Sequence, residues 1–297
     1  MKLFRLTFVS VAAAIMGLTF ALARAAESPS PMTANDLASR LSAFRQKGAS
    51  YVRLRMEING AIKETLQIQI KERRTKSSTE LVYQVLYPKE RKGESVLLRK
   101  IGNRPASGSV FVPPNTVRPI KDLKEPLLGS DLSYEDVIDN FFAWEQQALV
   151  GTEKVDGVNC SILESKPGQD QPSIYGSVRS WIDVRRLVPL RVEKYAKSVW
   201  PSPPSRPPSS PGELAERGVE GGEGEKSSGQ LLRRIDTTRV APSGNHKIPA
   251  GLTVSRARTD SSTLLDGSSI RYDVTYPDRD FTIEGLKQIT APPRSPD

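Results

Sequence analysis

The residues with the types and spacing for catalysis or metal binding form one acidic cluster. Asp131, Glu135, Asp136 and Asp139 could act as paired carboxylates in glycoside hydrolysis, or they could bind calcium. Ser133 and Asp136, however, have the Ser-x-x-acid spacing of a capping box, in which each side chain satisfies a backbone N–H at the start of a helix. Helix capping and the helix dipole account for two of these acids, so we prefer a structural role for the cluster.

Other residue types that support catalysis are scarce. His246 is the only histidine, so no serine or cysteine nucleophile has an evident imidazole base. One histidine and one cysteine cannot build a zinc site, and no glycine-rich phosphate loop follows a predicted strand. Cys160 lies between Val158 and Ile162 on a predicted strand and is expected to be a buried small hydrophobe. We therefore expect a protein that is not an enzyme and has no metal or cofactor.

The acidic cluster belongs to a segment, residues 127–140, that predicts one short amphipathic helix in a chain otherwise patterned as antiparallel sheet. At helical spacing, one face carries the apolar side chains of Tyr134, Val137, Ile138, Phe141 and Phe142. The opposite face carries Glu135, Asp136, Asp139 and Asn140. The apolar face requires an apolar partner, so we interpret the helix as a lid over the sheet.

A second helix is predicted at residues 33–47, where Thr33 and Asp36 form another capping box and Gly48 ends the helix. Alternating polar and apolar residues then predict strands, the first two joined at Asn59-Gly60. Further strands are expected at 81–87, 95–101, 109–112, 144–152, 159–166, 177–184, 189–195, 231–239, 252–258 and 270–276. Asp156-Gly157 and Asp266-Gly267 are predicted hairpin turns. A sheet of about ten strands must curl or close, because its twist accumulates.

The N-terminus has the pattern of a secretory signal peptide. Lys2 and Arg5 precede an apolar run at 6–22, and Ala23-Arg24-Ala25 offers small residues for cleavage after Ala25. An uncleaved membrane anchor is the less favoured alternative. Residues 1–25 are therefore assigned to a signal peptide and residues 26–297 to a single domain, located in the periplasm.

A proline- and glycine-rich stretch at 198–229 interrupts this domain. Its composition buries too little apolar surface to offset the entropy of ordering, so we predict a disordered insertion. A proline-rich recognition segment is the functional alternative.

The chain has a formal net charge of +9. Its basic residues are spread along the strands without interleaved aromatic residues, which argues against nucleic-acid binding. A solvated basic face is the simplest explanation, and attraction to an anionic membrane surface or an acidic partner is the functional one.

The order of these elements, together with Gly129-Ser130-Asp131-Leu132-Ser133-Tyr134-Glu135-Asp136, resembles the outer-membrane lipoprotein-sorting proteins of the LolA-like superfamily, in its larger uncharacterised periplasmic branch. Shorter supporting stretches are Ser180-Trp181-Ile182-Asp183 and residues 280–286. The likeness covers residues 33–197 and 229–289. It implies a mainly β fold, an incomplete antiparallel β-barrel with the N-terminal helix and the lid helix on its concave side, around an apolar cavity that carries acyl chains. The proline-rich insertion is a departure from that pattern.

We therefore expect a periplasmic carrier or chaperone that shields the acyl chains of a lipoprotein or lipid, with an inner-membrane transporter and an outer-membrane acceptor as partners, and acting as a monomer. The expected lipid-binding residues on the cavity floor are Val52, Leu54, Met56, Leu66, Ile68 and Ile70, and those on the cover are Leu127, Leu128, Tyr134, Val137, Ile138, Phe141 and Phe142. An ordinary packed core remains the alternative for any one of them. A non-catalytic periplasmic adaptor, or an accessory subunit of an envelope transporter, is the alternative function.

Overall fold

A computed structural model describes residues 32–45, 48–197, 229–243 and 246–293. The predicted signal peptide (residues 1–25) and residues 198–228 of the predicted insertion lie outside these ranges. Among the described residues, no helix is both long and apolar enough to cross a membrane.

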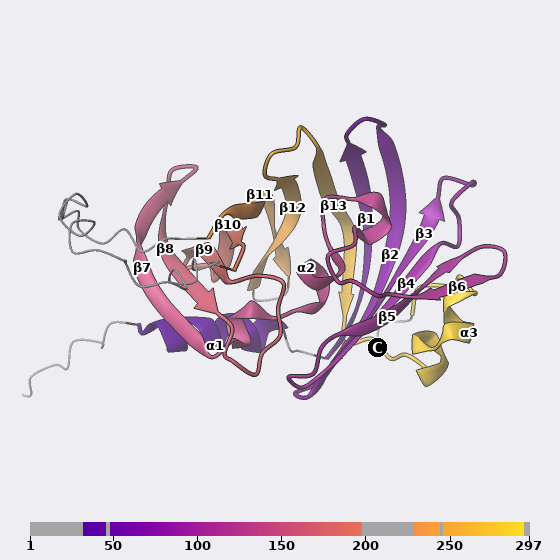
Figure 1. Cartoon of the computed structure of the whole chain (residues 1–297), viewed down its shortest axis with the longest axis horizontal. Coiled ribbons are helices and arrows are strands. Elements are labelled where there is room, and N and C mark those ends of the chain that lie inside the picture. Colours follow the sequence, from indigo (N-terminus) through magenta and orange to yellow (C-terminus); the bar gives the residue numbers. More distant parts are fainter. Residues whose placement is uncertain (1–31, 46–47, 198–228, 244–245, 294–297) are drawn as a thin grey trace, which may run out of the picture. The chain divides into compact units, whose positions relative to one another are not determined.

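The described part of the chain forms one 13-stranded antiparallel sheet built from two meanders, in which each strand pairs with the next (Figure 1). The first meander runs outward through β1 (Ala49–Asn59), β2 (Glu64–Arg74), β3 (Ser78–Tyr87), β4 (Ser95–Ile101), β5 (Ser107–Val112) and β6 (Thr116–Pro119). The second starts at the opposite edge of the sheet with β7 (Gln146–Val155) and β8 (Val158–Lys166). It returns through β9 (Ser177–Asp183), β10 (Val188–Tyr195), β11 (Leu231–Ser243), β12 (His246–Arg256) and β13 (Ser262–Tyr272).

Pairing between β1 and β13 joins the two meanders and makes them one sheet. The outer strands are β6 and β7, so the sheet is curved but not closed. The predicted mainly β, incomplete-barrel architecture is confirmed. The prediction of about ten strands was too low. Among the strands that the structure describes, only β6 overlaps none of the predicted segments; it has four residues and ends at Pro119, too short for an alternating pattern to show.

Two turn predictions had opposite outcomes. Asp156-Gly157 forms the two-residue connection between β7 and β8, and both residues have positive φ, 49° and 79°, as a type I′ hairpin turn requires. Asp266-Gly267, by contrast, is not a turn but lies inside β13, so this prediction was wrong. The pairing of β1 with β13 shifts register between Arg53 and Leu54, and Leu54 lies opposite Gly267. Gly267 therefore lies at a β-bulge within the strand and not at a turn.

A single segment, residues 120–145, connects β6 at one edge of the sheet to β7 at the other. We call it the crossover segment; it passes over the concave face of the sheet (Figure 1). It contains η1 (Leu127–Gly129), α2 (Tyr134–Ile138) and η2 (Phe141–Ala143). The one continuous helix expected up to Phe142 is therefore wrong, because Asp139 takes an extended conformation (φ −83°, ψ 149°) after Ile138.

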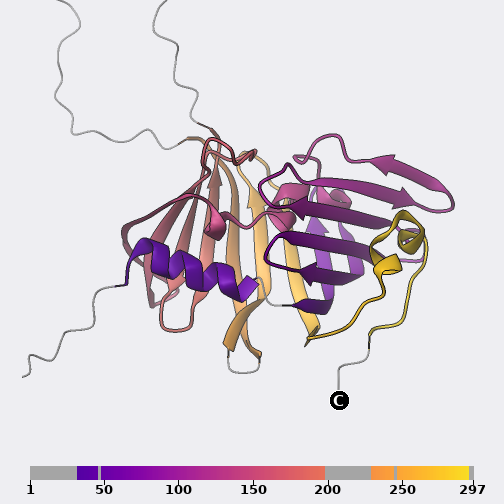
Figure 2. The ribbon, with the colours of Figure 1, turned by 90° about the horizontal axis from the view of Figure 1, so that it is seen from below.

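Two further helical regions cover the sheet. Helix α1 (Ala34–Arg45) begins with the predicted capping box, in which the Asp36 backbone N–H donates to Thr33 Oγ1 and the Thr33 N–H donates to Asp36. It packs with η2 on β8 to β10, on the same face as the crossover segment (Figure 2). The C-terminal helices η3 (Asp278–Phe281) and α3 (Ile283–Leu286) pack against side chains of the other face, such as Tyr51 and Val82.

A covered apolar cavity and its buried ion pairs

A partly open cavity of about 400 Å³ lies between the crossover segment and the concave face of the sheet. Most of its lining is apolar. The first meander contributes Val52, Leu54, Met56, Ile68, Ile70, Leu81 and Tyr83, and the second contributes Leu187, Pro189, Val192, Ile235, Pro249, Leu252, Val254 and Leu265. Leu132, Val137, Phe141 and Phe142 of the crossover segment cover it, and Leu41 of α1 reaches it. The cavity therefore spans the seam between the two meanders.

The residues predicted to bind lipid divide into two groups. Eight of them line the cavity: Val52, Leu54, Met56, Ile68, Ile70, Val137, Phe141 and Phe142. The other five are buried in the hydrophobic core that the crossover segment makes with β1 to β4: Leu66, Leu127, Leu128, Tyr134 and Ile138. One part of the crossover segment is therefore packed directly onto the sheet, and another part leaves a space beneath it.

None of the cavity-lining residues on β10 to β13 was among the predicted lipid-binding residues. Several of these cavity-lining residues, including Val192, Ile235 and Leu252, lie on segments that were correctly predicted as strands. Their position facing Val52 and Ile70 depends on the pairing of β1 with β13, which are separated by most of the chain. A local sequence pattern cannot predict a pairing between strands so far apart in the chain.

The acidic face of α2 is buried, which corrects the expectation of a polar outer face. Glu135, Asp136 and Asp139 are only 3%, 8% and 6% exposed. The predicted capping box is present: the Asp136 N–H donates to Ser133 Oγ, and the Ser133 N–H donates to Asp136 Oδ2 at 2.6 Å. These acids thus cap the helix and also bind other parts of the fold.

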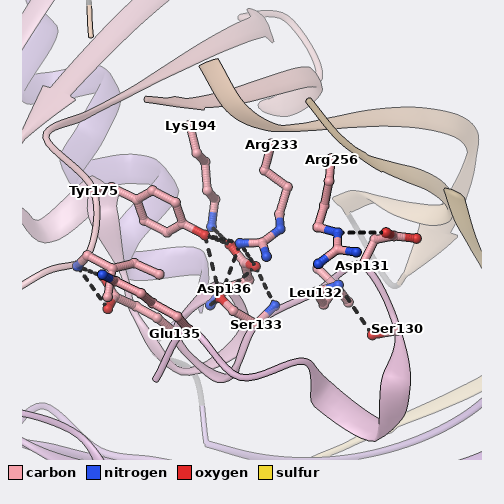
Figure 3. Close-up of polar contacts among 12 residues, drawn as sticks. Ser130, Asp131, Leu132, Ser133, Glu135, Asp136, Tyr175, Lys194, Arg233 and Arg256 are labelled. Atoms are coloured by element: carbon pink, nitrogen blue, oxygen red, sulfur yellow. Dashed lines mark hydrogen bonds and ion pairs between the residues drawn. The ribbon is translucent and has the colours of Figure 1, made fainter. Parts of the chain in front are cut away.

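Asp136 is the centre of a buried polar network (Figure 3). Lys194 Nζ of β10 lies 2.7 Å from Asp136 Oδ1, and Arg233 Nη1 of β11 lies 2.8 Å from Oδ2. The Tyr175 hydroxyl donates to Oδ1 at 2.7 Å and also accepts from Arg233. Burial raises the pKa of the Asp136 carboxyl, but the charges of Lys194 and Arg233 more than offset it, so the pKa lies below its ordinary value.

Glu135 points to a different part of the fold. Its carboxylate accepts hydrogen bonds from the Ser173 hydroxyl and from the backbone N–H of Ile174 at 2.9 Å. Burial raises the pKa of the Glu135 carboxyl, and these hydrogen bonds offset only part of that rise.

Asp131 and Asp139, at the two ends of the acidic segment, bind different parts of the sheet. Asp131 accepts from Arg256 of β12 at 3.1 Å and from the hydroxyls of Ser261 and Thr263, at 2.6 and 2.8 Å. Asp139 is paired with Lys100 at the end of β4. The crossover segment is therefore held to both meanders by buried or half-buried ion pairs.

The sequence did not predict the basic partners of these acids, although its pattern gives a weak indication of Lys194. It follows Val192 by two residues on β10, so strand alternation places a lysine on the inward face. Strand alternation gives no such indication for Tyr175, which precedes β9, or for Arg233, which lies among other charged residues of β11.

The arrangement favours binding of an apolar guest more than chemistry on a substrate. The carboxylates next to the cavity are engaged by capping and ion pairs, and most of the lining side chains are apolar. In the described ranges, no group of three or more His, Cys, Asp or Glu side chains is placed to hold a metal ion. Cys160 is buried in a separate hydrophobic cluster with Trp181, away from the cavity lining, and burial raises the pKa of its thiol.

A family model described as an uncharacterized protein matches residues 61–199. A search of curated proteins finds no match. Among solved structures, the chain is similar to a DUF1329 family protein from Desulfovibrio piger, with a TM-score of 0.70 and 22% identity over 85% of this chain and 97% of that one.

Two further similar structures carry informative descriptions. One is a putative outer membrane lipoprotein-sorting protein domain from Vibrio parahaemolyticus, with a TM-score of 0.68 and 18% identity over 86% of this chain and 98% of that one. The other is a LolA superfamily protein from Nitrosomonas europaea, with a TM-score of 0.61 and 18% identity over 86% of this chain and 100% of that one. At these identities the comparisons establish the fold.

Proposed function

We propose, from the premise that this chain has the LolA-like fold, that it is a non-catalytic carrier that shields acyl chains of a lipoprotein or lipid in its apolar cavity. The cargo would be received from an inner-membrane transporter and released to an acceptor at the outer membrane. This route places the protein in the periplasm, in agreement with the signal-peptide pattern at residues 1–25.

The observation that carries the proposal is the cavity itself. Its volume of about 400 Å³ is within the range of small-molecule sites, and most of its lining side chains are apolar. Each methylene group transferred from water into such a space contributes roughly 0.8 kcal/mol. An acyl chain therefore gains affinity from length alone, with no need for a charged pocket around its tail.

The direct test is lipid content and uptake. We expect native mass spectrometry of the purified protein to detect bound lipid, and the delipidated protein to take up a fluorescent fatty acid. Absence of both would contradict the carrier function.

A cavity-filling substitution ties uptake to this space. Ile70→Trp places a large ring inside the cavity and should lower fatty-acid affinity about tenfold or more, by displacing several methylene groups. Ile62→Trp is the matched control, since Ile62 is 81% exposed and should bind as wild type does. Thermal unfolding of both variants verifies that they are folded, and equal affinities would place the binding site elsewhere.

A further inference from the structure

Among the described residues, the cavity lining contains more positively charged than negatively charged side chains. Three are cations, Arg74, Lys194 and Lys247, and two are carboxylates, Glu72 and Asp136. A hydrocarbon chain requires none of them, so their arrangement bears on what else the cargo carries.

Most of these charges are already used within the fold. Lys194 is paired with Asp136, and Arg74 is paired with Glu72. Lys247 is different, because it is exposed and its side chain forms no ion pair or hydrogen bond with any residue that the structure describes. It is therefore a cation at the cavity that is available to a ligand.

Strand register places the available cation near one end of the cavity. Lys247 is the second residue of β12, and Gly251 further along that strand pairs with Asp266, which in turn pairs with Arg55. Lys247 therefore lies toward the end of the sheet at which β1 begins. Arg74 lies at this same end, since its N–H donates to the carbonyl of Gly48 at 2.9 Å.

A smaller polar pocket of about 150 Å³ adjoins this end and shares Arg74 with the cavity. It adds two more cations, Lys76 and Lys100, of which Lys100 is paired with Asp139. Asp139 Oδ2 is buried there without a hydrogen-bond partner among the described residues, and it would repel an anion seated deep in this pocket. The favourable place for an anion is therefore the cavity mouth, between Lys247 and Arg74.

We propose that the cavity selects amphiphiles with an anionic head group, whose acyl chain occupies the apolar space and whose phosphate or carboxylate is recognised by Lys247 with Arg74 at the mouth. This inference rests on the proposed carrier function and specifies its cargo class. Lys247 supplies the uncompensated charge, and the already paired Arg74 adds hydrogen-bond donors.

The test compares two ligands that differ only in charge. Palmitoyl lysophosphatidic acid and monopalmitoylglycerol share the chain and the glycerol, and we expect the delipidated protein to bind the phosphorylated ligand about fivefold more tightly at low salt. Salt should reduce that preference, because the mouth is open to solvent. Glycerol 3-phosphate and inorganic phosphate alone should not compete at equal concentrations, which separates a lipid head group from a free anion.

Variants assign the preference to the mouth. Lys247→Glu should abolish the preference for the phosphorylated ligand, and Lys247→Ala should reduce that preference. Lys63→Glu, at an exposed lysine outside the cavity lining, is the charge-matched control and should behave as wild type. Equal affinities of the wild type for the two lipids would overturn this inference and leave the carrier function standing. Failure to bind either lipid would instead overturn the carrier function.

Discussion

At the residue scale, the acids of the crossover segment connect it to separate parts of the sheet. Asp131 reaches β12 and β13, Asp136 reaches β10 and β11, and Asp139 reaches β4. A carboxylate that has lost its water must be compensated by a partner charge, so each contact is specific in position. These acids fix where the crossover segment lies, and the apolar side chains beside them determine what it covers.

Asp136 should be the most sensitive of these positions. Asp136→Asn removes the charge that compensates Lys194 and Arg233, and leaves both cations buried without their carboxylate. We expect a loss of about 3–5 kcal/mol in the free energy of unfolding, measured by urea denaturation at pH 7. Asp260→Asn, at an exposed position, removes the same charge and should change stability by less than about 0.5 kcal/mol. Similar losses for the two variants would refute the role given to Asp136.

Glu135 should produce a distinct pH dependence. Because its pKa is raised in the folded state, the folded protein binds this proton more tightly than the unfolded chain, and the contribution of Glu135 to wild-type stability decreases as pH rises from 4.5 through the folded pKa. Glu135→Gln lacks this titration, so the stability of the variant relative to wild type should increase with pH over that window. Urea denaturation at a series of pH values measures the difference, with Glu90→Gln as an exposed control. A difference that is constant with pH would contradict the burial of a titrating Glu135.

Both capping boxes could be predicted at this scale, whereas the ion pairs could not. A capping box is a relation between residues three positions apart, as in Ser133 and Asp136. The partner of Asp136 on β11, Arg233, is distant in sequence and becomes adjacent only after the second meander has formed. The polar residues of this short helix were therefore expected to face solvent, whereas Glu135 and Asp136 are in fact buried.

At the element scale, period-two alternation located most strands, but it could not distinguish a turn from a bulge at Asp266-Gly267. Both features use glycine, and the distinction depends on which strand lies opposite. The crossover segment was similarly predicted as one helix because apolar residues at 134, 137, 138, 141 and 142 fit a helical face. The break at Asp139 brings its carboxylate to Lys100 and gives Phe141 and Phe142 an independent position over the cavity.

A close contact between two strands gives an element-scale prediction. A Cβ atom at Gly108 of β5 would collide with the backbone carbonyl of Leu97 on β4 and with the Ile120 side chain. Gly108→Ala should therefore force the two strands apart and lower stability by about 1–3 kcal/mol. Gly60→Ala is the control, because a Cβ there meets only Ser261 at 3.7 Å. Thermal unfolding compares the two, and an unchanged midpoint for Gly108→Ala would contradict the strand packing described here.

At the scale of the whole molecule, the sheet order determines how the cavity is covered. The crossover segment begins at one edge of the sheet and ends at the other, so it is attached at both ends and is not a hinged flap. Opening it as a lid would require breaking buried pairs such as Asp136 with Lys194. A sequence-based prediction of an antiparallel open sheet did not contain this property, which follows from the long-range pairing of β1 with β13.

A cut in this segment tests the attachment. A protease site inserted at the exposed residues Lys121 and Asp122 would divide the protein between its two meanders. We expect the two fragments to remain together in native size-exclusion chromatography, since β1 and β13 stay paired, and to release a bound fatty acid faster than the intact chain. A site at Lys89 and Glu90, inside the first meander, should leave release unchanged. Separation of the fragments after the first cut would show that the crossover segment, and not the β1–β13 pairing, holds the halves together.

The same sheet order has a consequence for how the protein acquires its structure. Among the residues that the structure describes, eleven of the twelve strand pairings join neighbours in the sequence and can form early as hairpins, whereas the β1–β13 contact closes a loop that contains every other strand. The cavity spans that contact, so we expect it to form only in the last step of folding. Pulsed hydrogen exchange should show the amides that join β1 to β13 becoming protected after those of the hairpins. A partly folded chain would then have no hydrocarbon-binding space until its final strand is in place.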